Sequence, residues 1–346
     1  MVSQDSEIPI LSPAALSLTD SSKDEVLPSI IVVTGPTACG KSALALEIAK
    51  AFKGTIINAD SMQIYHDLSL LTAKPSYADM ACVPHKLYSI LSATDTCSVA
   101  RWLALAHAAI YDSQVAGRLP IIVGGTGLYI EVLRRGLAPV PEIPTTVRAE
   151  THRLMASIGS VAFHAKLAKR DPAMAIRLHP SDQQRLQRAW EVITATGYSL
   201  LYWWDKKRIY TRARFFVLLL RPTRPVLQKS CDRRFWRMAT TGGISEVTEL
   251  IAQNLPRSCP VFRALGVAAL IDYIQGRSTL EEAILAGQTL TRHYAKRQCT
   301  WFRRHITDAL IIPDLYSASD SSTLQILTSI RKFLSAQKTD SLSFYN

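Results

Sequence analysis

The sequence predicts an α/β fold, in which a parallel sheet is flanked by helices and carries an all-helical insertion. Two observations support this prediction. Over the first third of the chain, short apolar runs alternate with helical patterns, which is typical of a parallel sheet. Residues 137–205 interrupt the alternation, because they contain helical patterns and no run that resembles a strand.

The individual elements follow from local patterns. The strands predicted before the insertion are Ile30–Val33, Thr55–Ile57 and Leu119–Val123, separated by helices over 41–52 and 98–116. The insertion contains helices over 145–170 and 182–196. After it come a strand at Phe215–Leu220, helices over 223–304 with breaks near Gly242–Gly243 and 256–260, a last strand at Ala309–Ile312 and a helix over 321–336.

The patterns divide the chain into four segments. Residues 1–28 are predicted to be a flexible tail, because they carry five acidic residues, one lysine and three prolines. Residues 29–136 form the first part of the α/β core, and residues 137–205 form the insertion. Residues 206–346 form the second part of the core and include basic helices.

Composition restricts the partners and the compartment. The net charge of +12 favours a polyanionic partner, although a generally basic protein is an alternative. The six cysteines contain no C-x-x-C pair, so we expect reduced thiols in a cytoplasmic protein and neither disulfides nor a zinc site. No apolar run reaches the roughly 18 residues of a transmembrane helix, so we expect no membrane partner.

A phosphate-binding loop is the clearest motif. Residues 35–42 fit the pattern G-x-x-x-x-G-K-[ST] between a predicted strand and a predicted helix. This context makes the sheet P-loop NTPase-like, with backbone N–H groups and a helix N-terminus directed at phosphate oxygens. The motif assigns a phosphate contact to Lys41 and Mg²⁺ coordination to Ser42. The eight residues are Gly35, Pro36, Thr37, Ala38, Cys39, Gly40, Lys41 and Ser42.

Asp60 and Thr126 each follow a predicted strand, so they belong at the edge of the sheet where ligands bind. Asp60 suits a general base, and it suits the N-cap of a following turn equally well. Thr126 is either a polar contact for a ligand or an ordinary turn residue. The strand at Leu119–Val123 ends in glycines without the metal-positioning Asp of an NTPase, which argues against an NTPase or a kinase.

Several motifs occur together in a specific order. They are Gly35–Ser42, Asn58–Gln63, Thr72–Pro75, Val123–Tyr129, His179–Leu186 and Thr291–Trp301. In this order and spacing they resemble the tRNA dimethylallyltransferases, also called the IPP transferase family, from about residue 30 to residue 304. The combination is highly specific, whereas the phosphate-binding loop alone is not.

The resemblance implies the reaction and its substrates. Dimethylallyl diphosphate would bind to the phosphate loop with Mg²⁺, and the exocyclic amine of the adenine 3′ of the anticodon, position 37 of tRNA, would attack it. Asp60, Thr126, Lys41 and Arg234 would be the catalytic residues, with Asp60 taking the proton of the amine. Arg233 is a rival of Arg234 for the diphosphate contact.

The resemblance also implies the surface that binds the tRNA anticodon stem-loop. The insertion, the basic helices of residues 206–237 and the segment 292–304 would contact it. We expect the protein to act as a monomer. The implied tRNA-binding residues are Asp60, Ser61, Met62, Gln63, Thr126, Arg148, Gln184, Arg185, Leu186, Gln187, Arg188, Lys296, Arg297 and Gln298.

The sequence departs from the family pattern at a few positions. Cys39 stands where the family loop usually has a smaller residue, and Leu71 stands where it usually has Gly. The C-terminal region lacks the Cys/His zinc module of some eukaryotic members, which favours a bacterial-type enzyme. A kinase on the same sheet, or an RNA-binding protein with an inactive phosphate loop, are the alternative functions.

Overall fold

The fold was analysed in a computed structural model that describes residues 27–208, 210–317 and 322–336. The predicted acidic tail therefore lies almost wholly outside the described residues. Contacts divide the chain into two compact units. One unit comprises the described parts of Met1–Val132 and Arg212–Asn346, and the other is Leu133–Thr211. The helical segment that the sequence predicts, 137–205, lies within the second unit.

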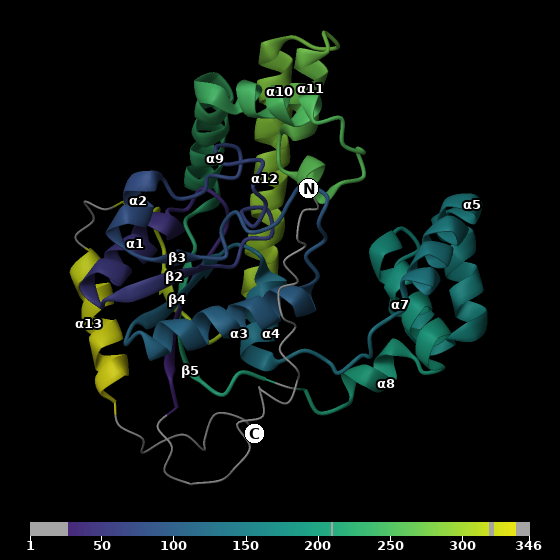
Figure 1. The fold of residues 1–346 in the computed structure, drawn as a ribbon, viewed down its shortest axis with the longest axis horizontal. Helices are drawn as coiled ribbons and strands as arrows, with labels where there is room; N and C mark the ends of the chain where they lie inside the picture. Colours follow the sequence, from purple (N-terminus) through teal and green to yellow (C-terminus); the bar gives the residue numbers. More distant parts are fainter. Residues whose placement is uncertain (1–26, 209, 318–321, 337–346) are drawn as a thin grey trace, which may run out of the picture. The chain divides into compact units, whose positions relative to one another are not determined.

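The larger unit contains a six-stranded parallel sheet in its described residues, with the strand order β3-β2-β4-β1-β5-β6 (Figure 1). The predicted α/β fold class is thus confirmed. The strands are β1 (Ser29–Thr34), β2 (Gly54–Asn58), β3 (His85–Lys86), β4 (Leu119–Gly124), β5 (Arg214–Leu220) and β6 (Leu310–Ile312). β3 is a two-residue strand that the sequence did not reveal, because it is defined by its pairing with Ile56 and Ile57 of β2.

Helices cover both faces of this sheet. They are α1 (Lys41–Ala51), α2 (Tyr77–Cys82), α3 (Val99–Val115), α4 (Gly127–Arg135) and α13 (Ser322–Ser335). Side chains of α1 and α13 pack with Ile31, Val33 and Leu218 in one hydrophobic core. Alternate residues of a strand point to opposite faces, so Ile30 and Val32, both fully buried, point to the other face.

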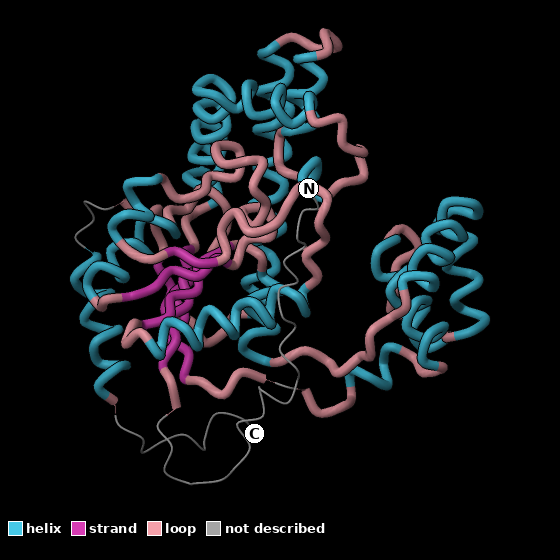
Figure 2. The backbone as a smooth tube through the Cα atoms, viewed as in Figure 1, coloured by secondary structure: helices cyan, strands magenta, loops and turns pink. Residues whose placement is uncertain are grey.

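A helical part of the larger unit extends away from the sheet (Figures 1 and 2). It consists of α9 (Arg224–Met238), α10 (Ile244–Ala252), α11 (Val267–Ile274) and α12 (Leu280–His305). The predicted break at Gly242–Gly243 is the short π-helical turn between α9 and α10. The ring of Phe235 packs so closely against Gly266 and Gly287 that a Cβ at either glycine would lie within about 2.1 Å of it. This contact locks α9, α11 and α12 together.

Within the described residues, the smaller unit consists of helices joined by loops (Figure 2). Its helices are α5 (Thr145–Arg170), which bends at Gly159, α6 (Pro172–Ala175), α7 (Gln183–Thr196) and α8 (Leu200–Trp204). Phe163, Leu167, Leu186, Ala189 and Val192 form its core. Because this core is made only of side chains from the unit, it has its own source of stability.

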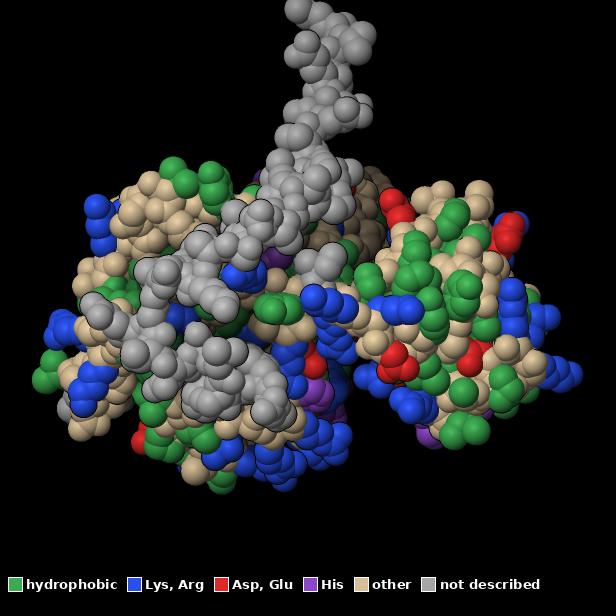
Figure 3. Space-filling view, turned by 90° about the horizontal axis from the view of Figure 1, so that it is seen from below, with side chains coloured by type: hydrophobic (Ala, Val, Ile, Leu, Met, Phe, Trp, Pro, Cys, Tyr) green, Lys and Arg blue, Asp and Glu red, His purple; other side chains and the backbone are tan. Residues whose placement is uncertain are grey.

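The surface charge and the character of the helices agree with the expectations from composition. Lys and Arg side chains are far more abundant than Asp and Glu on the face shown in Figure 3. None of the described helices combines the length and the apolar character that a membrane crossing requires.

Candidate active site

The phosphate loop connects β1 to α1 at the carboxyl edge of the sheet. Gly40 has φ +94° and Ala38 has φ +64°, so the backbone visits the left-handed region within the loop. A Cβ at Gly40 would lie 2.3 Å from the carbonyl oxygen of Tyr316, so only glycine fits there. No acidic residue lies in the first turn of α1, which leaves the positive end of this helix available to an anion.

Hydrogen bonds fix the carbonyl groups of the loop, two of them from donors outside it. Ser230 Oγ donates to Ala38 O at 2.8 Å, and the backbone N–H of Tyr316 donates to Cys39 O at 3.1 Å. Lys41 Nζ donates to Pro36 O at 2.6 Å. When successive carbonyls face away, the N–H groups between them converge on the opposite side, which is the arrangement that binds phosphate.

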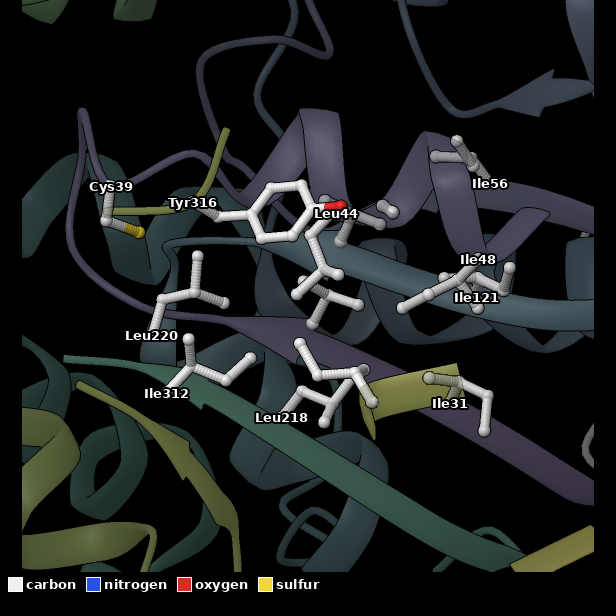
Figure 4. Close-up of a cluster of buried hydrophobic side chains, with 14 of the residues drawn as sticks. Ile31, Cys39, Leu44, Ile48, Ile56, Ile121, Leu218, Leu220, Ile312 and Tyr316 are labelled. Atoms are coloured by element: carbon white, nitrogen blue, oxygen red, sulfur yellow. The ribbon is translucent and has the colours of Figure 1, made fainter. Parts of the chain in front are cut away.

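The side chain of Cys39 belongs to the core behind the loop, although the residue also lines the cavity. It is fully buried and packs with Leu44, Leu220 and Tyr316 (Figure 4). Burial raises the pKa of its thiol, with a smaller opposing effect of the Lys41 ammonium group. The thiol is therefore neutral and acts as a small apolar side chain.

A cavity of about 420 Å³ opens beside the loop. Its walls come from the phosphate loop, from Asp60, from the segment 63–74, from the end of β4 and from α9 and α12. Phosphate-binding groups and a carboxylate thus face one cavity, although they are distant in the sequence. This arrangement suits the transfer of a group from a phosphate ester to a nucleophile.

Asp60 has the capping role that its position suggested, and it also lies where a base would be needed. Its Oδ1 accepts the backbone N–H of Met62 at 2.9 Å, so it caps the following turn, while the side chain lines the cavity. Asn58 fixes the backbone on both sides, because its Oδ1 accepts the N–H of Asp60 and its Nδ2 donates to Asp60 O. Among the described residues the second carboxylate oxygen accepts no hydrogen bond, so it is available to a ligand.

Thr126 is joined to the Asp60 turn. Its Oγ1 accepts the backbone N–H of Ser61 at 3.0 Å and donates to Ser61 Oγ at 3.4 Å. Its own N–H donates to Ala59 O at 3.2 Å. Thr126 therefore holds the Asp60 turn against the end of β4, and its contact with a substrate stays a prediction.

The structure separates the two rival arginines. Arg234 lies on the face of α9 that lines the cavity, whereas Arg233 is exposed on the same helix. Burial lowers the pKa of Arg234, and the nearby carboxylate of Asp60 opposes this effect. An arginine without a paired carboxylate at a phosphate site is a strong anion ligand. The geometry favours Arg234 for the diphosphate contact.

The predicted RNA-binding residues are distributed over both units. Arg148, Gln184 and Arg185 are exposed in the smaller unit, and Gln187 and Arg188 are half-buried there. Leu186 is fully buried in the core of that unit, so the prediction that it contacts RNA is corrected: it supports the surface from below.

The remaining predicted contacts belong to the larger unit. Ser61, Met62 and Gln63 form the turn after Asp60, and Gln63 donates to Thr72 O and Ala73 O at 2.8 and 3.0 Å. Lys296 and Arg297 are exposed on α12. Gln298, in contrast, is only 6% exposed, and both ends of its amide are bonded to protein backbone.

The wall formed by residues 63–74 depends on two charged residues that sequence reasoning did not assign to the site. Glu246 of α10 accepts the backbone N–H groups of Ser69, Leu70 and Leu71 at 2.6 to 2.9 Å. Lys74 donates to Tyr65 O, His66 O and Ser89 Oγ. Burial lowers the pKa of Lys74 to about 8. The motif Thr72–Pro75 marks Lys74 in the sequence, but nothing local marks Glu246.

Comparisons with known proteins agree with this geometry. The family model described as IPP transferase matches residues 63–305, and a model described as isopentenyl transferase matches residues 28–88. The chain is 48% identical to a tRNA dimethylallyltransferase of Paramagnetospirillum magneticum over 295 residues, which cover 85% of this chain and 94% of the relative. It is 47% identical to that of Rhodospirillum rubrum over 311 residues, covering 89% and 94%.

Two solved structures are also similar. One is the full-length tRNA isopentenylpyrophosphate transferase of Bacillus halodurans, with 32% identity, a TM-score of 0.65 and coverage of 89% of this chain and 97% of that one. The other is a eukaryotic dimethylallyltransferase acting on tRNA, with 26% identity, a TM-score of 0.79 and coverage of 89% and 80%. The chain is therefore a transferase and belongs to the IPP transferase family, whose relatives are named tRNA dimethylallyltransferases.

Proposed function

We propose that this protein transfers a dimethylallyl group from dimethylallyl diphosphate to the exocyclic amine of the adenine at position 37 of tRNA, next to the anticodon, and releases diphosphate. The observation that carries the proposal is the single cavity shared by the phosphate loop, Arg234 and Asp60. The names of the relatives support the choice of donor and acceptor.

The donor binds by its diphosphate. Backbone N–H groups of the loop, the N-terminus of α1, Lys41 and Arg234 supply positive potential at this end of the cavity. As the bond between the allylic carbon and its oxygen breaks, negative charge grows on the leaving diphosphate. The same groups stabilise that charge, so they favour the transition state over the ground state.

The acceptor amine needs a base. The amine nitrogen forms a bond to the first allylic carbon, and its proton passes to the Asp60 carboxylate. The pocket position of Asp60 and its fixed backbone support this role. Thr126 keeps the turn that carries Asp60 in place.

The residues of the loop also fit Mg²⁺. The Ser42 hydroxyl stands at the start of α1 and lines the cavity. Within the described residues no group of three or more His, Cys, Asp or Glu side chains could hold a metal ion, so substrate phosphates and water would complete the coordination, as is usual for Mg²⁺. Bound Mg²⁺ would neutralise part of the charge of the diphosphate.

We propose that the smaller unit binds the anticodon stem-loop, with Arg148, Gln184 and Arg185 at its surface, and that Lys296 and Arg297 of α12 contact the same RNA. The exposure of these side chains and the excess of Lys and Arg support this proposal. The target adenine must leave the stacked loop to reach a cavity. We place the reaction in the cytoplasm and expect a monomer.

The test is incubation with radiolabelled dimethylallyl diphosphate, Mg²⁺ and unmodified tRNA. We expect label in the tRNA, and no label when adenine 37 is replaced by another base. A matched reaction with ATP in place of the labelled donor separates this function from a kinase. Consumption of ATP without transfer of the prenyl label would overturn the proposal.

A further inference from the structure

The side chain of Gln298 connects two loops of the site that are far apart in the sequence. Its Oε1 accepts the backbone N–H of Thr37 in the phosphate loop at 2.7 Å. Its Nε2 donates to the carbonyl oxygen of Gly125, at the end of β4, at 2.8 Å. The residue is 6% exposed and lines the cavity; its bond to Gly125 is buried, where an unpaired partner is costly, and its bond to Thr37 is part-buried.

Only an amide satisfies both contacts. Thr37 presents a donor and Gly125 presents an acceptor, and glutamine has one acceptor and one donor end at matching positions. A carboxylate at this position would place two acceptors beside each other at Gly125. An apolar side chain would leave the part-buried N–H of Thr37 and the buried carbonyl of Gly125 without this partner.

Gly125 packs closely against the side-chain amide of Gln298. A Cβ at Gly125 would lie 2.3 Å from Gln298 Nε2, while the next nearest atoms are 3.5 Å away. Gly125 is not among the residues with positive φ, so backbone strain does not demand glycine there. A side chain at position 125 would therefore have to displace the Gln298 amide.

Further hydrogen bonds connect Gly125 to the turn that carries Asp60, the proposed base. Thr126 follows Gly125 directly, and it is bonded to Ala59 O and to the N–H of Ser61, the two residues that flank Asp60. A continuous series of hydrogen bonds therefore runs from the loop for the donor phosphate to the turn that holds the carboxylate. Gln298 bonds to the loop on one side and to Gly125 on the other, so its side chain joins the two halves of this series.

We infer that Gln298 is a positioning residue: it fixes the distance between the bound diphosphate and the Asp60 turn, and it does so without contacting RNA. This inference rests on the proposed function. Transfer requires the reacting atoms to be aligned within a few tenths of an ångström, and a misplacement of about 1 Å costs roughly 10²-fold in rate. Loss of Gln298 should therefore affect turnover more than binding.

The experiment uses Gln298→Met, which keeps length and removes both hydrogen bonds. We expect kcat for prenyl transfer to fall about 10- to 100-fold, with little change in the affinity for inorganic diphosphate measured by calorimetry or in KM for tRNA. A raised KM for tRNA with unchanged kcat would overturn the inference and support an RNA contact. Weaker diphosphate binding with unchanged kcat would also overturn it.

Gln288→Met is the matched control. Gln288 lies on the same helix, is half-buried and donates to the backbone oxygen of Asp232 at 3.1 Å, but it does not line the cavity. This variant should lose a similar amount of stability and keep its kcat. Equal losses of kcat in both variants would mean that the effect is general destabilisation.

A second variant tests the same contact from the other side. Gly125→Ala should push the Gln298 amide away and lower kcat to a similar extent, whereas the same substitution in a Gln298→Ala background should cost little more. Additive losses would contradict the inference. A wild-type protein that transfers no prenyl group would instead contradict the proposed function, and the two failures are therefore distinguishable.

Discussion

At the scale of single residues, Asp60 both caps a turn and lines the cavity, so one side chain is a candidate for a structural and a chemical role. One carboxylate oxygen caps the turn through Met62, and the side chain also lines the cavity. The sequence could not decide between a cap and a base, because both roles require the same residue type just after a strand.

Asp60→Asn separates the two roles. Asparagine keeps an oxygen for the N–H of Met62 but cannot take a proton, so kcat should fall by about 10²- to 10⁴-fold while diphosphate binding persists. Steady-state kinetics and calorimetry measure the two effects. Asp95→Asn is the control, because Asp95 also accepts a backbone N–H, from Ser92 at 3.0 Å, but lies outside the cavity. Normal turnover of Asp60→Asn would leave the residue with the capping role alone.

The two neighbouring arginines give a second prediction at this scale. Arg234 faces the cavity, so Arg234→Gln should weaken the binding of inorganic diphosphate about 10- to 100-fold, the effect of losing a charged hydrogen bond in a desolvated site. Arg233→Gln should leave it unchanged, because Arg233 is exposed. Calorimetric titration of both variants measures this. The reverse order of effects would assign the contact to Arg233.

At the scale of elements, α10 supports a wall of the site from a distance. The Glu246 carboxylate of this helix accepts three consecutive backbone N–H groups, those of residues 69–71. These residues precede Ala73 and Lys74, which also line the cavity. The helical part of the larger unit is thus coupled to the substrate pocket.

Glu246→Gln should destabilise this wall. The glutamine amide keeps one acceptor oxygen, but its NH₂ group would face a backbone N–H that the carboxylate now accepts. We expect a loss of about 1–3 kcal/mol in the free energy of unfolding. Urea denaturation measures the loss, with Glu249→Gln as the control because Glu249 is exposed on the same helix. If both variants are as stable as the wild type, the three hydrogen bonds do not hold the wall.

At the scale of the whole molecule, the positive charge of the chain should determine how tRNA binding depends on salt. The protein carries 40 Lys and Arg against 28 Asp and Glu. Each phosphate contact releases counterions, so affinity falls linearly on a plot of log K against log salt.

Arg297→Gln should reduce the slope of that plot by about one unit, if Arg297 contacts a phosphate. Lys50→Gln removes the same charge from the last turn of α1, where Lys50 pairs with Glu47 at 3.0 Å, and should leave the slope unchanged. Filter-binding titrations over a range of salt concentrations distinguish the two. Equal slopes for both variants and the wild type would remove Arg297 from the RNA surface.

The sequence by itself determined the features that depend on neighbouring residues. Short apolar runs predicted β1, β2, β4 and β5, and the phosphate loop was recognised because its glycines, Lys41 and Ser42 lie within eight residues. Asp60 was found for a similar reason, since it directly follows a strand. These features are local, so a single stretch of the sequence is enough to predict each of them.

Only the tertiary structure decided the contacts between distant stretches. The choice of Arg234 over Arg233 depends on which face of α9 meets the cavity, and the burial of Leu186 depends on the packing of the smaller unit. The links from Gln298 to Thr37 and from Glu246 to Ser69 span 261 and 177 residues. A hydrogen bond depends on the distance and the direction between two groups in space, and neither can be read from their separation in the sequence.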